Sequence, residues 1–261
     1  MGKITSIEDL QQLKTKALQN VNPTQTVIQV CLGPGCLAQG ADKVMATFKR
    51  ICKSKGQEIS IEPLLKETGC HGFCKMGPLV TILPANLFYT RAKPADVEEI
   101  VEKTIIQGEV IERLLYSENG TTYKDAASIP FYKMQQKIAT RNLGIIDPRV
   151  LEDALLQGAY QAAAKALTSM TPDQVVREIE ISGLRGRGGA GFPTGRKWRS
   201  AIAALKKDPG PAYVVCNGDE GDPGAFMDRA IMEGDPHSVL EGMIIGAYAI
   251  GAHQGFLYVR A

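Results

Sequence analysis

Histidine, net charge and long hydrophobic runs are all scarce in this chain of 261 residues. The three histidines, His71, His237 and His253, stand far apart and form no Ser–His–Asp arrangement, so we expect no hydrolytic side-chain catalysis. The apolar stretch 243–252 is broken by glycines and is too short to span a bilayer, which argues against direct membrane insertion. A net charge of +2 excludes a general polyanion binder, and we expect no nucleic-acid partner.

Cysteine is also sparse, but four of the six cysteines form two close pairs. Cys31 and Cys36 have four residues between them, and Cys70 and Cys74 have three. Four thiolates in two pairs are the usual ligands of a [2Fe–2S] cluster or of a structural zinc ion. The gaps fit zinc less well, because zinc ribbons favour two residues between paired cysteines. Disulfides are a third option, but no signal peptide precedes the chain and we expect a cytoplasmic setting.

The residues around these pairs predict an α/β domain. Their patterns predict, in order, a strand, a helix, three strands and a closing helix, at residues 26–30, 41–53, 58–65, 79–83, 87–91 and 94–107. The paired cysteines then lie on loops at one end. Cys52 falls on the apolar face of the first helix and is expected in the core. For His71 we expect an orienting or exposed role rather than ligation.

A second unusual stretch, residues 183–198, contains six glycines and four cationic side chains. Glycine lets backbone N–H groups approach an anion closely, and a helix beginning near Thr194 would direct its positive end to the same place. After a short strand, residues 216–224 supply carboxylates and an amide suited to hydroxyls and ring N–H groups. The two loops together predict a site for a phosphorylated nucleotide.

Residues 186–191 satisfy G-x-G-x-x-G, but this pattern indicates a dinucleotide fold only directly after a strand. The preceding segment predicts a helix instead, because Thr171, Pro172 and Gln174 form a capping sequence. At this point two alternatives remain open for the loops. One is an arginine–glycine loop that contacts nucleic acid, and the other is a solvated acidic turn at 219–222.

Both regions resemble known families. One resemblance is to the flavin-binding subunit of respiratory complex I and its soluble relatives in multimeric iron–iron hydrogenases and formate dehydrogenases. It is carried by the sequences of residues 141–148, 182–198, 216–229 and 233–238. The front third resembles the thioredoxin-like [2Fe–2S] ferredoxins. The second resemblance implies that all four paired cysteines, Cys31, Cys36, Cys70 and Cys74, are cluster ligands.

The first resemblance implies FMN on the glycine loop with NAD(P)H stacked above it. The residues implied to hold the FMN phosphate and ribityl chain are Gly186, Arg187, Gly188, Gly189, Gly191 and Lys197. Those implied to line the isoalloxazine are Asn217, Asp219, Glu220 and Gly221. Phe192 and Asp222 would meet the nicotinamide nucleotide, although many relatives carry Glu where this chain has the shorter Asp222.

We therefore expect a thioredoxin-like [2Fe–2S] domain at 1–110, a linker at 111–130 and an FMN/NAD(P)H-binding α/β domain at 131–261. We expect that last domain to continue in a longer polypeptide that also holds a [4Fe–4S] cluster. The resemblances imply an NAD(P)H-dependent oxidoreductase subunit that relays single electrons through iron–sulfur clusters.

The fused layout favours a cytoplasmic complex, with electron bifurcation a further option. Its other members would be a ferredoxin-like subunit and a hydrogenase or formate dehydrogenase catalytic subunit. The alternatives are the flavoprotein subunit of a membrane-associated NADH:quinone oxidoreductase and a zinc-stabilised scaffold without redox chemistry.

Overall fold

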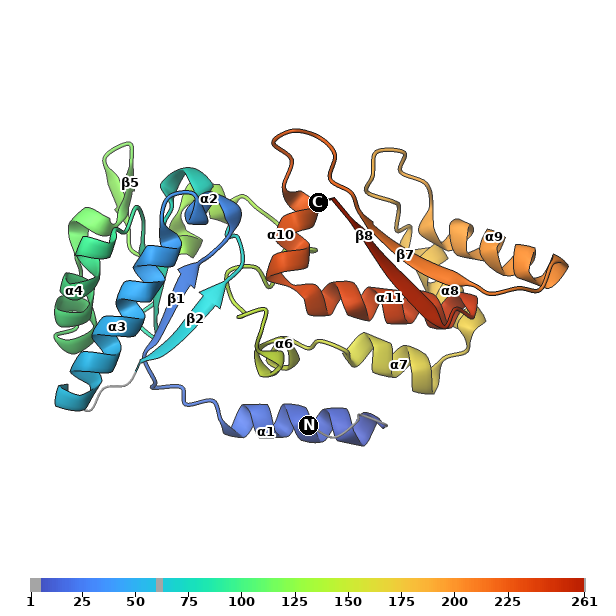
Figure 1. Cartoon of the computed structure of the whole chain (residues 1–261), viewed down its shortest axis with the longest axis horizontal. Helices are drawn as coiled ribbons and strands as arrows, with labels where there is room; N and C mark the ends of the chain where they lie inside the picture. Colours follow the sequence, from blue (N-terminus) through green and yellow to red (C-terminus); the bar gives the residue numbers. More distant parts are fainter. Residues whose placement is uncertain (1–5, 60–62, 261) are drawn as a thin grey trace. The chain divides into compact units, whose positions relative to one another are not determined.

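The computed structural model describes residues 6–59 and 63–260. Its contacts divide the chain into two compact units (Figure 1). We call Ala17–Ala154 with Ala230–Asp235 the cysteine unit. We call Met1–Lys16, Leu155–Arg229 and Pro236–Ala261 the glycine unit. Each unit is built around its own buried apolar cluster.

The cysteine unit is built on a four-stranded sheet with the order β2-β1-β3-β4. Its strands are β1 (Val27–Cys31), β2 (Leu64–Thr68), β3 (Val80–Leu83) and β4 (Leu87–Tyr89). β1 is parallel to β2 and antiparallel to β3, which is in turn antiparallel to β4. Parallel neighbours need a long crossover, and α3 (Ala41–Ile59) supplies it.

Helices cover this sheet and complete its core. Val44 and Phe48 of α3 are fully buried, as are Val97 and Ile100 of the closing helical segment. That segment runs through η2 (Pro94–Asp96), α4 (Val97–Glu99) and η3 (Ile100–Ile106), where the last part is a π-helix. Figure 1 shows α3 lying alongside β1 and β2. The element order predicted from the sequence for this region is confirmed.

One predicted strand, residues 58–65, is wrong in its bounds. The helix α3 continues to Ile59, residues 60–62 lie outside the described part, and β2 begins only at Leu64. Pairing with β1 decides the position, because Val27 lies opposite Leu64 and Cys31 lies opposite Thr68. The pairing with β1, and not local β propensity, thus sets the strand at Leu64–Thr68.

The chain after the closing helix also packs on the core of the cysteine unit. Ile111, Leu114, Leu115 and Ile129 are buried there. Between them, η4 (Glu112–Leu114) leads to a hairpin of β5 (Tyr116–Glu118) and β6 (Thr121–Tyr123), and η5 (Ala126–Ser128) and α5 (Pro130–Lys133) follow. Residues 111–130, which the sequence suggested as a linker, thus contain side chains that pack on the core of this unit.

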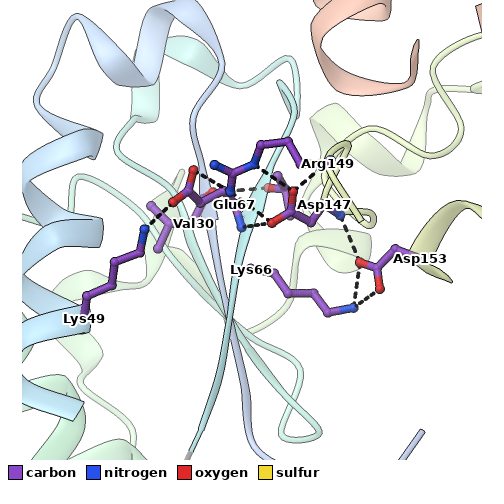
Figure 2. A network of polar contacts seen from close by, with 8 residues as sticks. Val30, Lys49, Lys66, Glu67, Asp147, Arg149 and Asp153 are labelled. Carbon is purple, nitrogen blue, oxygen red and sulfur yellow. Dashed lines mark hydrogen bonds and ion pairs between the residues drawn. The ribbon is translucent and has the colours of Figure 1, made fainter. Parts of the chain in front are cut away.

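A polar network joins the next segment to β2 (Figure 2). Lys66 donates to both carboxylate oxygens of Asp153, at 2.6 and 2.7 Å, just inside α6 (Leu151–Leu156). Glu67 forms ion pairs with Lys49 at 2.6 Å and with Arg149 at 2.7 Å. The backbone N–H of Glu67 donates to Asp147 at 3.2 Å. This network stabilises residues 147–153 against the strand that leads to the second cysteine pair.

In the glycine unit, α11 (Pro236–Ile250) is the central element. It packs on the helices α7 (Gln161–Ser169), α8 (Pro172–Ser182) and α9 (Thr194–Lys207), and also on the strand β7 (Tyr213–Gly218). β7 pairs in parallel with β8 (Gln254–Val259). Three further helices of the described chain extend across the boundary of this unit, namely α1 (Ile7–Gln19), α6 (Leu151–Leu156) and α10 (Met227–Gly234).

The start of α8 confirms the capping sequence. The Thr171 hydroxyl accepts from the Gln174 N–H at 3.3 Å, and the Gln174 side chain accepts from the Thr171 N–H at 2.7 Å. Pro172 occupies the first turn, and Gly183 ends the helix with a positive φ of 67°. The glycine-rich loop therefore follows a helix and not a strand, as the sequence indicated.

No helix in the described part of the chain combines the length and the apolar character that crossing a bilayer requires.

Candidate functional site

The four paired cysteines converge at one end of the sheet in the cysteine unit. Cys31 ends β1, Cys36 lies in the short helix α2 (Pro34–Leu37), and Cys70 and Cys74 flank the turn before β3. Cys31, Cys36 and Cys70 are buried, and Cys74 is partly buried. The Sγ atoms of Cys70 and Cys74 lie 3.5 Å apart.

Hydrogen bonding between the thiols links all four into one group. Bonding with Cys36 raises the pKa of Cys31 to about 12 and lowers the pKa of Cys36. Bonding with Cys31 also raises the pKa of Cys70, and burial raises the pKa of Cys74 to about 11. Adjacent thiols oppose one another's ionisation, because each new thiolate adds negative charge to the same small volume. A cationic iron or zinc centre is the kind of group that relieves this repulsion.

Glycines allow the two cysteine loops to lie against each other. A β-carbon on Gly33 would lie 2.6 Å from the Cβ of Cys70, and one on Gly77 would lie 2.8 Å from the Sγ of Cys36. The side chain of Gln39 joins the same loops, since its amide donates to the carbonyl of Gly35 and to that of Cys74, each at 2.7 Å. This close stacking brings loops that are far apart in the sequence into one site.

A backbone N–H group donates to one of the thiols. The Gly72 N–H donates to the Cys70 Sγ at 3.3 Å, and Gly72 has a positive φ of 85° that this turn requires. Hydrogen bonds of this kind to sulfur tune the potential of an iron–sulfur cluster. Among the described residues, no three His, Cys, Asp or Glu side chains have an arrangement that would hold a single metal ion.

His71 follows Cys70 directly and is partly buried. Its Nε2 lies 3.4 Å from the Thr68 hydroxyl, and its ring packs on Phe88 with centroids 5.8 Å apart. Burial first, and then the charge of Lys137, lowers the pKa of His71 to about 4, so the ring is neutral at physiological pH. Cys52 packs at the edge of the core, as the apolar face of α3 predicts.

The glycine-rich loop of the other unit is closed at its neck and open at its tip. The Gly186 N–H donates to the Phe192 carbonyl at 2.9 Å, and the Thr194 N–H donates to the Leu184 carbonyl at 2.9 Å. Above this neck, a β-carbon on Gly188, Gly189 or Gly191 would meet no atom within 4 Å. The loop thus presents an exposed rim of backbone to a ligand.

Two features of the loop suit an anionic nucleotide. Gly189 and Gly191 have positive φ values of 103° and 60°, which turn successive peptide groups in directions that other residues rarely adopt. The helix α9 begins directly after the loop, as predicted, and no side chain caps its first turn. Arg187 and Lys197 are exposed, and Phe192 is 49% exposed with the Arg196 guanidinium 6.0 Å from its ring centroid.

The acidic loop follows β7. The Asn217 side chain accepts from the Asp219 N–H at 2.9 Å, which shapes the turn. Asp219 and Asp222 are exposed, and the Gly221 carbonyl accepts from Arg260 at 2.6 Å. Figure 1 shows this loop and the glycine-rich loop on the same side of α11 within the unit.

Glu220 has a structural partner that the sequence did not indicate. Its carboxylate accepts from the N–H of Asp228 at 3.0 Å and from that of Arg229 at 3.2 Å, and so caps the first turn of α10. Burial raises the pKa of Glu220, but these backbone donors outweigh it and the net pKa is lowered. The nearest sequence signal was its position a few residues before a helix.

Comparison with known families assigns both regions. Residues 16–105 match the family model described as the thioredoxin-like [2Fe-2S] ferredoxin, and residues 179–261 match that of the Nuo51 FMN-binding domain. Residues 16–105 are thus similar to the thioredoxin-like [2Fe–2S] ferredoxins, and residues 179–261 are similar to the Nuo51 FMN-binding domain. Both resemblances noted in the sequence are thereby confirmed, and so is the α/β class. The first matched region contains the paired cysteines, and the second contains the glycine-rich loop and the acidic loop.

Several curated proteins are similar to this chain. The NADP-reducing hydrogenase subunit HndC of Solidesulfovibrio fructosivorans is 58% identical over 129 residues, which is 49% of this chain and 25% of that protein. An NADH-quinone oxidoreductase subunit of Aquifex aeolicus is 50% identical over 115 residues, which is 43% of this chain and 26% of that protein. The chain thus spans about a quarter of the length of these relatives.

Solved structures give two further likenesses. A thioredoxin-like [2Fe-2S] ferredoxin from Aquifex aeolicus is 32% identical and covers 36% of this chain and 93% of its own, with a TM-score of 0.33. A chain of an NAD+-reducing [NiFe]-hydrogenase is 23% identical over 97% of this chain and 43% of its own, with a TM-score of 0.38.

Proposed function

We propose that this chain is the part of an NAD(P)-linked flavoprotein subunit through which electrons enter or leave a multi-subunit redox complex. The single observation that supports it most is the convergence of four mutually linked thiols in a ferredoxin domain joined to an FMN-binding domain. Bound to the chain, FMN would supply the exchange between two-electron nicotinamide chemistry and one-electron iron–sulfur chemistry.

The ferredoxin domain would hold a [2Fe–2S] cluster through Cys31, Cys36, Cys70 and Cys74. The unsatisfied charge of four adjacent thiolates fits a cationic cluster, and the Gly72 N–H already donates to one sulfur. Burial of Cys31, Cys36 and Cys70 keeps water away from their sulfur atoms.

The FMN-binding domain would hold the flavin phosphate on the open glycine rim, through Gly186, Arg187, Gly188, Gly189, Gly191 and Lys197. Asn217, Asp219 and Gly221 would line the isoalloxazine, and Phe192 and Asp222 would meet the nicotinamide nucleotide. Glu220 would support the flavin side of this loop while it caps α10. For the domain boundaries we propose 1–110 and 131–261, joined by residues 111–130, which pack on the core of the cysteine unit.

The proposal is tested on anaerobically purified protein. We expect bound FMN, and two irons with two acid-labile sulfides for the ferredoxin domain. Cys36→Ala and Cys70→Ala should each remove the [2Fe–2S] signal in the visible and electron paramagnetic resonance spectra. The matched Cys52→Ala variant should keep it, because Cys52 packs on the core away from the site. Zinc in a colourless preparation would overturn the redox assignment.

For the physiological complex we propose a hydrogenase or formate dehydrogenase with a separate ferredoxin-like subunit, because the 58% identity with a hydrogenase subunit exceeds the 50% identity with a quinone-reductase subunit. Electron bifurcation within that complex is part of the proposal. Mass spectrometry of the native complex, with NAD(P)H formation driven by hydrogen or formate, distinguishes it from a quinone-reducing complex. Reduction of quinone with neither catalytic subunit present would contradict it.

A further inference from the structure

The hydroxyl of Tyr132 is buried in the cysteine unit and has no hydrogen-bond partner among the described residues. Tyr132 lies in α5, beyond the residues that match the ferredoxin family. A buried hydroxyl without a partner costs free energy, and native structures contain few of them. An isolated donor of this kind therefore points to an acceptor that completes the site.

Aromatic packing fixes the ring of Tyr132 beside the second cysteine pair. It meets Phe73, which lies between Cys70 and Cys74, edge-on with centroids 5.5 Å apart. It meets Phe88 of β4 edge-on at 5.9 Å. A ring held from two sides has little rotational freedom, so the direction of its C–O bond is set by the fold.

Lys137 holds the same ring from another side. Its Nζ lies 5.0 Å from the centroid of Tyr132 and donates to the carbonyl of His71 at 3.4 Å. The Tyr132 ring is thus tied to the chain that directly follows Cys70. The spacing of residues along the sequence does not indicate this contact between Lys137, Tyr132 and His71.

The four paired cysteines are the ionisable neighbours that act on the Tyr132 hydroxyl. Burial first, and then the charges of Cys31, Cys70, Cys36 and Cys74, raises the pKa of Tyr132. The Tyr132 hydroxyl therefore keeps its proton at physiological pH and can act as a hydrogen-bond donor.

We propose that the Tyr132 hydroxyl donates a hydrogen bond to a sulfur atom of the [2Fe–2S] cluster and thereby raises the reduction potential of that cluster. The inference rests on the proposed function, since it requires the cluster on the four cysteines. Reduction adds one electron to the cluster, so a donor to sulfur stabilises the reduced form more than the oxidised form. The proton stays on Tyr132, and no covalent bond forms or breaks in the chain.

The test compares Tyr132→Phe with Tyr116→Phe in the anaerobically purified protein. Tyr116 is a matched control because its ring also meets Phe73 edge-on, with centroids 5.0 Å apart, while its hydroxyl interacts with Glu118 and not with the thiols. Each change removes one oxygen and keeps the ring. A redox titration followed by electron paramagnetic resonance then measures the midpoint potential of the [2Fe–2S] centre.

We expect Tyr132→Phe to retain full iron and sulfide and to lower the equilibrium constant for one-electron reduction about tenfold, which is about 59 mV. Tyr116→Phe should leave the potential unchanged. Resonance Raman spectra give an independent measure, because exchange into D₂O should shift an iron–sulfur stretching mode of the wild type, with a smaller shift in Tyr132→Phe.

The possible outcomes distinguish a failure of the proposed function from a failure of the role of Tyr132. A wild-type protein without iron and sulfide overturns the proposed function itself. A loaded cluster whose potential and D₂O shift are the same in wild type and Tyr132→Phe leaves the proposed function standing and overturns the role of Tyr132. An equal change of potential in both Tyr→Phe variants also overturns it, because the effect would then come from general repacking around Phe73.

Discussion

Gly35 faces Cys74 so closely that no side chain fits between them. A β-carbon on Gly35 would lie 2.6 Å from the Cβ of Cys74 and 3.0 Å from its Sγ. The absence of a side chain at this position therefore sets how near the two cysteine loops can approach. The geometry of the thiols depends on residues that carry no functional group.

Replacing Gly35 by Ala should displace Cys74 and impair assembly of the [2Fe–2S] site. Overpacking of this kind costs about 1–3 kcal/mol, and the displaced loop is the one that carries two thiols. We expect the iron and acid-labile sulfide per chain to fall by at least half. Gly242→Ala is the control, since a β-carbon there would meet nothing within 4 Å. Full iron loading of Gly35→Ala would show that the loops can separate without loss of the site.

The open rim of the glycine loop predicts a defect that appears only with ligand. Gly188→Ala should reduce retention of FMN about tenfold or more, because a methyl group would stand where the backbone approaches the phosphate. Without ligand the variant should unfold like the wild type, since the added β-carbon would meet no atom within 4 Å. FMN content and fluorescence titration measure the effect.

Gly210→Ala is the matched control for the rim, because its added β-carbon also meets nothing within 4 Å and it lies outside the loop. It should bind FMN normally. If Gly188→Ala and Gly210→Ala retained FMN equally well, the assignment of the rim to the flavin phosphate would be wrong.

The cap that Glu220 forms on α10 predicts a stability effect without any ligand. Glu220→Ala should lower the melting temperature by a few degrees at neutral pH, whereas Asp222→Ala should leave it within error. Backbone donors lower the folded-state pKa of Glu220 below 4.5, so the stabilisation is complete above that pH and is lost in more acidic solution. Melting curves from pH 7 to pH 3 should therefore converge for the wild type and Glu220→Ala, and a pH-independent difference would contradict the cap.

The ion pairs on β2 predict unequal losses of stability. Asp153→Asn should lower the free energy of unfolding by about 1–3 kcal/mol, because the Lys66 and Asp153 side chains are only 20% and 9% exposed. Lys49→Met should cost less than about 1 kcal/mol, since Lys49 is 57% exposed and water screens its pair with Glu67. Urea denaturation of the loaded protein measures both, and equal losses would contradict the difference in burial.

Local signals in the sequence identified most of the secondary structure. The capping sequence at Thr171 and the β-branched run before Cys31 act within a few residues, so a single sequence contains the information they use. The bounds of β2 were wrong because its register depends on pairing with β1, which lies much earlier in the chain. The packing of residues 111–130 on the core was not predicted for a related reason, since it depends on contacts with segments far away in the sequence.

Some residues of the candidate sites could also be predicted from the sequence, and others are seen only in the structure. The spacing of the cysteines and the glycine-rich pattern can be seen in the sequence alone. They predicted Cys31, Cys70 and the loop at Gly188 as candidate site residues. The role of Gln39 as a bridge between the cysteine loops has no signal in spacing. Neither does the burial of the Tyr132 hydroxyl, which follows from the packing of Phe73 and Phe88 around it.

The sequence by itself determined which chemistry this protein carries, because ligand types, glycine-rich turns and helix caps act through residues close together in the chain. Only the tertiary structure decided which groups complete each site. The two cysteine pairs and the Tyr132 ring come from separate segments, and the burial of apolar side chains holds these segments together. Their meeting is a property of packing, and packing depends on all the segments at once.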